Sequence, residues 1–143
     1  MDIAIGNKTD FPESIYVIKE NDKKIVEAKG DYRRIMERKP IDMIYNFEYD
    51  THRDFIYYRN SGFNHVLANI AKKRDIVVGF SFNKFKEAKN KYQILGRLHQ
   101  NFRLARKYKV KTHVVSFAKK QSELQNEITL KAFERLLIKK KLY

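Results

Sequence analysis

The sequence predicts an α/β fold with a parallel sheet of repeated βα units, arranged as part of a TIM-like (β/α) barrel. Short runs rich in β-branched residues alternate with longer amphipathic segments, a pattern typical of parallel sheets. One run, IVVGFSF at 76–82, is almost continuously apolar, as expected of a strand covered on both faces. At 143 residues the chain fits one domain, 1–143, but a complete barrel needs about 200 residues or more. We therefore expect a trimmed barrel or an open sheet.

Five segments are predicted to be strands because they are short, apolar and rich in β-branched residues. Breakers such as the NKTDFPES cluster after Gly6 separate some of them. The five segments are 1–6, 15–19, 41–47, 76–82 and 111–117.

Four segments are predicted to be helices because their apolar residues recur at helical spacing. Asn21 or Asp22 could cap the first, and Pro40 would stop it. Asn64 or Ser61 could cap the second. The four helices are 23–39, 63–73, 92–108 and a last one that contains Leu130 and Leu137.

The basic residues are numerous and concentrated. The chain has 31 Lys and Arg against 17 Asp and Glu, for a net charge of +14. Residues 84–120 hold 12 of the bases and a single acid, Glu87. A surface built on ion-pair networks would interleave acids with these bases. The excess instead favours a polyanionic partner, and we expect RNA.

The helix predicted at 92–108 turns one arc of apolar residues inward and places Arg97, Arg103 and Lys107 on the opposite arc. A solvated helix face is the alternative to an RNA contact. If the arc binds phosphates, alanine at any of these three positions should weaken RNA binding without unfolding the domain. The candidate RNA-binding set here is Arg97, Arg103, Arg106, Lys107, Lys109 and Lys111.

A second candidate set lies in and before RNSGFNHVL at 59–67. Gly62 could let the backbone approach closely or adopt a positive φ, and Asn64 could cap a helix whose free amino-terminal amides also suit a phosphate. The alternative for this segment is a plain loop that ends in a helix cap. Tyr57 and Tyr58 are surface candidates between two arginines. The residues of this set are Arg53, Arg59, Asn64 and His65.

Other residues are assigned structural roles. The aromatic residues Tyr45, Phe47 and Tyr49 alternate as in a half-buried strand, so we expect them in the core. Gly79 is expected to serve packing. His99 and His113 are expected to be structural hydrogen bonders.

Several classes of site are not expected. Cysteine is absent, so thiolate chemistry, disulfides and cysteine-rich zinc sites are excluded. The four histidines stand apart, without HxH or HExxH spacing, so we expect neither a metal site nor a catalytic residue. The first residues lack the pattern of a signal peptide, and no apolar run could span a membrane. We expect a cytoplasmic protein.

Four segments, taken in order and spacing, resemble the archaeal and eukaryotic ribonuclease P protein component 3 family. The resemblance covers roughly residues 41–120, and because family members are longer at both ends it implies a shortened barrel here. The segments are RNSGFNHVL at 59–67, GFSF at 79–82, GRLHQNFRLARKYKV at 96–110 and SFA at 116–118.

The resemblance implies an RNA-dependent endoribonuclease subunit. In ribonuclease P the RNA removes the 5′ leader from precursor tRNA, and this protein would bind and activate that RNA. The implied partners are ribonuclease P RNA, ribonuclease P protein component 2 and other ribonuclease P proteins, with precursor tRNA contacted indirectly. Mg is expected for the RNA, and no cofactor for the protein itself.

Two other functions stay open. The family fold is similar to that of the polymerase and histidinol phosphatase metallophosphoesterases, so a small metal-dependent phosphoesterase is one alternative. A general binder of double-stranded RNA is the other.

Overall fold

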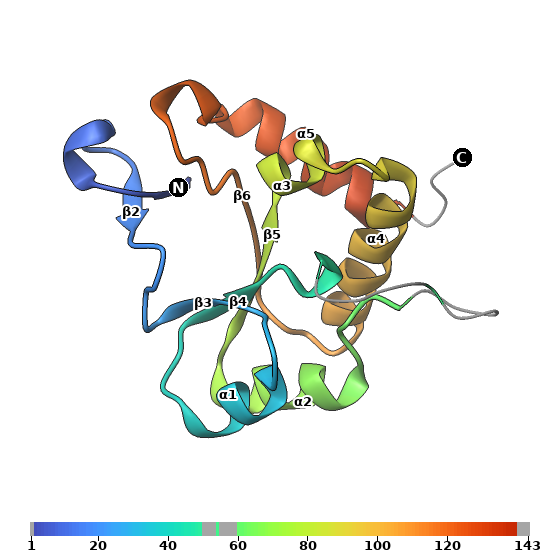
Figure 1. Ribbon diagram of the computed structural model, residues 1–143. Coiled ribbons are helices and arrows are strands. Elements are labelled where there is room, and N and C mark those ends of the chain that lie inside the picture. The colour runs from blue at the N-terminus through green and yellow to red at the C-terminus, as the bar shows by residue number, and fades with distance from the viewer. Residues whose placement is uncertain (1, 50–53, 55–59, 140–143) are drawn as a thin grey trace.

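The computed structural model describes residues 2–49, 54 and 60–139, in which parallel strands alternate with helices (Figure 1). The predicted α/β class is confirmed. The strands are β1 (Ile3–Ile5), β2 (Tyr16–Ile18), β3 (Ile25–Glu27), β4 (Met43–Tyr45), β5 (Val77–Ser81) and β6 (Thr112–Val115). The α-helices are α1 (Tyr32–Arg38), α2 (His65–Arg74), α3 (Phe82–Glu87), α4 (Lys91–Lys107) and α5 (Glu127–Ile138). Short 3-10 helices form at η1 (Lys8–Asp10), η2 (Phe47–Tyr49) and η3 (Gln121–Glu123).

The strands form two parallel sheets that meet at one bridge. Strands β3, β4, β5 and β6 pair in sequence order, and β1 pairs with β2. A parallel bridge between Ala4 and Ala118 joins β1 to the segment that follows β6, and the Ile5 amide donates to the Ala118 carbonyl at 2.8 Å. Over the described residues β2 and β3 are not paired. The strand order is therefore that of an open sheet.

The prediction of one helix over 23–39 is wrong in its first half. Ile25 lies in β3, where it pairs with Met43 of β4, and α1 does not begin until Tyr32. Asp22 is not a helix cap: its Oδ1 accepts from the amides of Lys24 and Ile25, both at 2.8 Å, and turns the chain into the strand. The β-branched side chains of this segment fit a sheet better than a helix.

The remaining predicted elements are confirmed with shifted ends, and one helix was missed. Strands β1, β2, β4, β5 and β6 lie inside the five predicted runs, and α2, α4 and α5 match the last three predicted helices. Helix α3 has only six residues and follows β5 directly, with Ser81 as its N-cap. A segment this short cannot show a repeated helical spacing, so the pattern of apolar residues could not reveal it.

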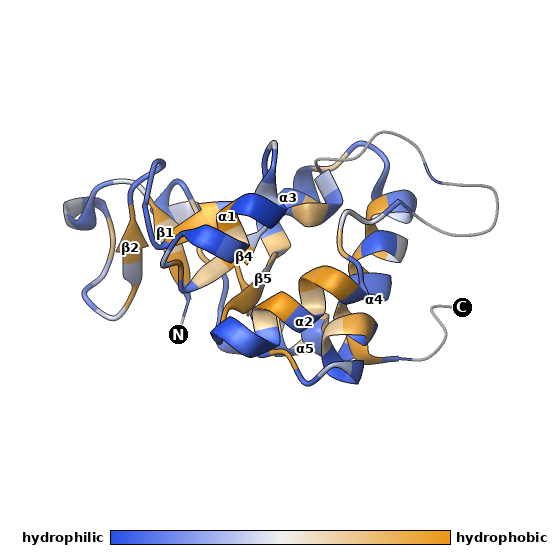
Figure 2. Cartoon of the chain, turned by 90° about the horizontal axis from the view of Figure 1, so that it is seen from below, coloured by the Kyte–Doolittle hydropathy of each residue, from blue (hydrophilic) through white to orange (hydrophobic). Residues whose placement is uncertain are grey.

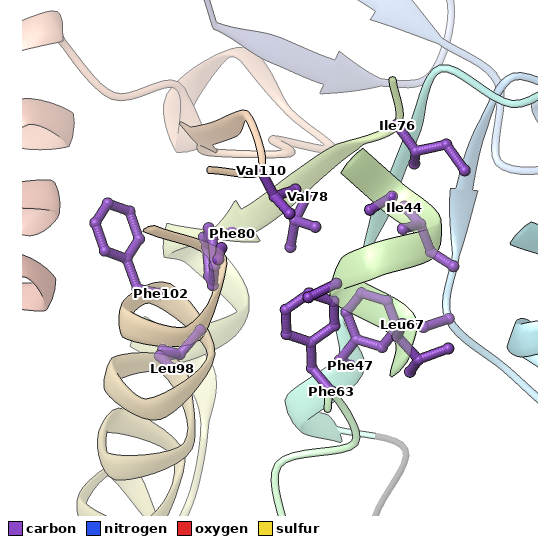
Figure 3. Packing of buried hydrophobic residues seen from close by; sticks show 14 of the residues in the cluster. Ile44, Phe47, Phe63, Leu67, Ile76, Val78, Phe80, Leu98, Phe102 and Val110 are labelled. Carbon is purple, nitrogen blue, oxygen red and sulfur yellow. The ribbon is translucent and has the colours of Figure 1, made fainter. Parts of the chain in front are cut away.

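The five α-helices contribute to one face of the four-stranded sheet, where the larger core lies. Figure 3 shows Ile44, Val78 and Phe80 of the strands meeting Leu67, Leu98 and Phe102 of the helices. The rings of Phe80 and Phe102 are 5.3 Å apart, centroid to centroid. Alternate orange and blue bands on α2 in Figure 2 mark the amphipathic pattern that directs this packing.

The opposite sheet face carries a second core shared by both sheets. The stacked rings of Tyr45 and Phe117, 4.1 Å apart, lie in it. One cluster that spans β1, β2, β4 and β6 indicates a sheet curved around these side chains. Its buried members are Ile3, Ile18, Met43, Tyr45, Val115 and Phe117.

The aromatic residues at 45, 47 and 49 belong to the core, but not to one strand face. Strand β4 ends at Tyr45, and Asn46 has φ 66°, which turns the chain. Tyr45 therefore packs in the second core and Phe47 in the helix-side core, while Tyr49 is half-buried. The expected burial is confirmed for Tyr45 and Phe47, and the expected continuous strand is wrong.

Gly79 leaves space for the second core, as its predicted packing role requires. A Cβ at this position would lie 2.9 Å from Met43 Sδ and 3.1 Å from Tyr45 Cβ. Gly79→Ala is expected to lower the free energy of unfolding by about 1 to 3 kcal/mol, because overpacking forces neighbouring strands apart. Urea denaturation measures this change. An unchanged midpoint would show that Met43 and Tyr45 of β4 move aside at no cost in free energy.

Candidate nucleic-acid interface

Arg97 does not lie on the exposed arc that helical spacing predicts for it. Its side chain is 2% exposed, and its Nε lies 3.0 Å from Asp54 Oδ1. Its Nη1 donates to the Glu48 carbonyl at 3.1 Å. The prediction is wrong because Glu48 and Asp54, from the segment between β4 and α2, cover this side of α4.

Asp54 is held as a carboxylate by its partners. Burial alone would raise its pKa, but the Asn60 amide, which donates to Oδ1 at 2.8 Å, and the Arg97 guanidinium lower the pKa below its ordinary value. The carboxylate therefore anchors Arg97, and the ion pair fastens Asp54 to α4.

Glu48 and Asn101 continue this polar network inside the protein. Both residues are buried, and Asn101 Nδ2 donates to Glu48 Oε1 and to the Ser61 carbonyl, each at 2.9 Å. Burial raises the pKa of Glu48 from 4.5 to about 7, against the lowering effects of the Asn101 hydrogen bond and the Arg97 charge. Sequence reasoning missed this network, because helical spacing cannot separate a polar residue facing solvent from one facing a covering loop.

The other five members of the candidate set on and after α4 are exposed. Arg103, Arg106 and Lys107 project from its last turns, and Lys109 and Lys111 follow in the turn before β6. Lys111 Nζ lies 3.1 Å from Asp75 Oδ1, but both side chains are at least 70% exposed. A pair so open to water contributes little stability, so Lys111 can turn to another anion.

The second candidate set is described only in part. Arg53 and Arg59, with the neighbouring Tyr57 and Tyr58, lie outside the described residues. Asn64 caps α2, since its Oδ1 accepts from the Leu67 amide at 3.0 Å, and His65 is exposed in the first turn. Ser61 does not cap; its hydroxyl contacts the Phe63 carbonyl and accepts from Gln100.

The conformation expected of Gly62 is confirmed. Its φ is +76°, a region that favours glycine. The Gly62 carbonyl accepts from the Tyr32 hydroxyl at 2.9 Å, so this turn is also tied to α1.

Asn64 can be tested separately as a cap and as a phosphate contact. Asn64→Ala is expected to lower the free energy of unfolding by about 1 kcal/mol through loss of the cap. Asn64→Asp should keep that stability, because a carboxylate also caps, but it should weaken RNA binding if the position meets a phosphate. Urea denaturation and RNA titration of both variants separate the two roles. If the wild-type chain and both variants bound RNA with equal affinity, Asn64 would not belong to the interface.

The histidines do not gather into a site in the described part of the chain. His99 is buried in α4 and His113 half-buried in β6. Within residues 2–49, 54 and 60–139 no group of three or more His, Asp or Glu side chains could hold a metal ion. No helix in these ranges is both long and apolar enough to cross a membrane.

Comparison with known proteins adds no family to this description. A search against protein-family models finds no match for the chain, and a search of curated proteins finds none. The fold and the surface define an α/β protein whose α4 helix ends in exposed guanidinium and ammonium groups. Such groups, placed on a rigid helix, can contact several phosphates at once.

Proposed function

We propose that this chain is a protein subunit of ribonuclease P, which binds and activates the catalytic RNA for removal of the 5′ leader from precursor tRNA. The observation that carries the proposal is the exposed cationic group formed by Arg103, Arg106, Lys107 and Lys109. Within residues 2–49, 54 and 60–139, no ion pair neutralises these four side chains, so their charge is available to RNA phosphates.

The packing of the segments that resemble the ribonuclease P protein component 3 family also supports the proposal. Asn101, in the segment 96–110, donates to the Ser61 carbonyl of segment 59–67. Phe102, in the same segment, packs against Phe80 of segment 79–82. Three of the four segments thus meet at α4, as a shared structural unit would require.

In this proposal the RNA, with its Mg, performs the cleavage, and the protein supplies no catalytic residue. Ribonuclease P protein component 2 and other ribonuclease P proteins are the proposed protein partners, in the cytoplasm. We also propose that the open sheet is a trimmed TIM-like barrel. The missing pairing between β2 and β3 in the described residues would then mark the place where the ring is interrupted.

Reconstitution of precursor tRNA cleavage, with and without this chain, tests the proposal. Added protein should raise the cleavage rate, and a variant with Arg103→Ala, Arg106→Ala and Lys107→Ala should raise it less. Cleavage that is indifferent to the protein, or a pull-down that recovers no ribonuclease P RNA, would contradict the proposal. Phosphoester hydrolysis by RNA-free protein with added Mn or Zn would favour the phosphoesterase instead.

A further inference from the structure

Basic residues precede every strand of the four-stranded sheet. We call the segments that lead into β3, β4, β5 and β6 the amino-terminal rim; they are residues 22–24, 37–42, 72–75 and 106–111. The strands are parallel, so all four segments arrive at the same edge of the sheet. The cationic residues of the rim, all exposed, are Lys23, Lys24, Arg38, Lys39, Lys72, Lys73, Arg74, Arg106, Lys107, Lys109 and Lys111.

Backbone hydrogen bonds place these segments side by side. The Lys24 carbonyl accepts from the Asp42 amide at 2.8 Å, and the Asp42 carbonyl accepts from the Val77 amide at 2.9 Å. At the other end, the Lys111 carbonyl accepts from the Val78 amide at 2.9 Å. At ordinary strand spacing the four strand starts span about 14 Å, a width over which several phosphates can be met.

Side chains also fix the helix ends that contribute to the rim. Arg74, at the end of α2, donates to the carbonyls of Glu37 and Lys39 at the end of α1. Asp75 ends α2 in a left-handed conformation, and its amide donates to the Ala71 carbonyl. The cations therefore stand on a rigid base, and binding RNA would not require the backbone to be ordered first.

The charge of the rim exceeds what its helices need. The segments hold eleven cations and four acids, Asp22, Glu37, Asp42 and Asp75, a surplus of seven. Cations near a helix carboxyl terminus stabilise the helix dipole, which accounts for those on α1, α2 and α4. It does not account for Lys23, Lys24, Lys109 and Lys111, which lie outside the helices, whereas Lys39 is the C-cap residue of α1.

The rim offers charge but no platform for bases. Its one aromatic residue, Tyr108, is half-buried, and Lys107 Nζ lies over the ring at 5.9 Å from its centroid. Unpaired RNA is usually held by exposed aromatic rings, whereas paired RNA is recognised through its phosphates and shape. We infer that the amino-terminal rim docks on the phosphate backbone of double-helical RNA. This inference rests on the proposed function and names the surface and the kind of RNA element.

The test compares two variants of equal charge. The rim variant carries Lys24→Ala, Lys39→Ala, Lys73→Ala and Lys109→Gly. The control removes four exposed cations from α3 and from the segments that follow α3 and β6, by Lys86→Ala, Lys89→Ala, Lys119→Ala and Lys120→Ala. Lys109 has φ 57°, so glycine there relieves backbone strain while it removes the charge. Urea denaturation checks that both variants fold.

Binding to a perfectly paired RNA of about 16 base pairs and to a single strand of the same length is measured over a range of salt concentrations. The wild-type chain should prefer the duplex. The salt slope is the slope of the logarithm of the binding constant against the logarithm of the salt concentration. For the duplex, its magnitude should be about 3 smaller in the rim variant than in the wild-type chain, which amounts to about 10²-fold in affinity near physiological salt. In the control variant, the magnitude of this slope should fall by less than about 1.

Equal losses in the two variants, or equal wild-type affinity for single-stranded and paired RNA, would overturn the inference. The proposed function is judged apart from this result, by reconstituted precursor tRNA cleavage. If the wild-type chain stimulates cleavage and the rim variant stimulates it equally, the rim inference fails and the proposed function stands. If the rim variant loses duplex binding but the wild-type chain does not stimulate cleavage, the proposed function fails and the rim stands.

Discussion

Arg97→Ala is expected to lower the free energy of unfolding by about 3 kcal/mol, the effect of breaking a buried, hydrogen-bonded ion pair. The substitution leaves the Asp54 carboxylate without its guanidinium partner and the Glu48 carbonyl without the Nη1 donor. Asp54 is 23% exposed, so water relieves part of the cost. The expectation that Arg97→Ala would weaken RNA binding without affecting the fold is thus replaced by a loss of stability.

Urea denaturation of Arg97→Ala, Arg97→Lys and Arg103→Ala measures this effect. Lysine cannot reach Asp54 and the Glu48 carbonyl with a planar fork, so Arg97→Lys should also be destabilised. Arg103 is exposed on the same helix, and its replacement should change stability by less than about 0.5 kcal/mol. If Arg97→Ala were as stable as Arg103→Ala, the buried ion pair would be refuted.

Stability is expected to fall as the pH rises from about 5 to about 8, by up to about 3 kcal/mol, because of Glu48. Burial raises the pKa of this carboxyl from 4.5 to about 7 in the folded protein. Between these values the folded protein holds a proton that the unfolded chain releases, so higher pH favours unfolding. The stabilising contribution is complete below the lower value and lost as the pH passes the higher one.

Glu48→Gln provides the matched comparison. The amide retains an oxygen that can accept from Asn101 Nδ2 but does not ionise, so the variant should show a flatter dependence of stability on pH. Chemical denaturation of both proteins at several pH values gives the two curves. If the two curves were parallel, Glu48 would not titrate over this pH range.

Local patterns in the sequence were sufficient for most elements. Asn64 at the start of α2, the apolar run of β5 and the amphipathic spacing of α4 and α5 each act over a few neighbouring residues. The segment 23–39 was misassigned because Ile25 and Val26 fit the apolar spacing of a helix as well as that of a strand. Their pairing with Met43 and Ile44, distant in sequence, decides between the two.

The candidate interface was predicted less well, for a related reason. Charge counts correctly indicated a concentrated cationic region, and Arg103, Arg106, Lys107, Lys109 and Lys111 are exposed. Arg97 also falls outside the apolar arc, although closer to its border than Arg103 and Lys107 do, yet it is buried. What separates them is the contact of Arg97 with Glu48 and Asp54, and helical periodicity carries no information about such distant partners.

By itself the sequence determined the α/β class, the order of most strands and helices, and the sign and concentration of the charge, because these depend on composition and short-range spacing. Only the tertiary structure decided which cations reach solvent and which segments share an edge. Parallel pairing brings 22–24, 37–42, 72–75 and 106–111 together across more than eighty residues of chain. Burial of Arg97 against Asp54 likewise depends on contacts between distant segments.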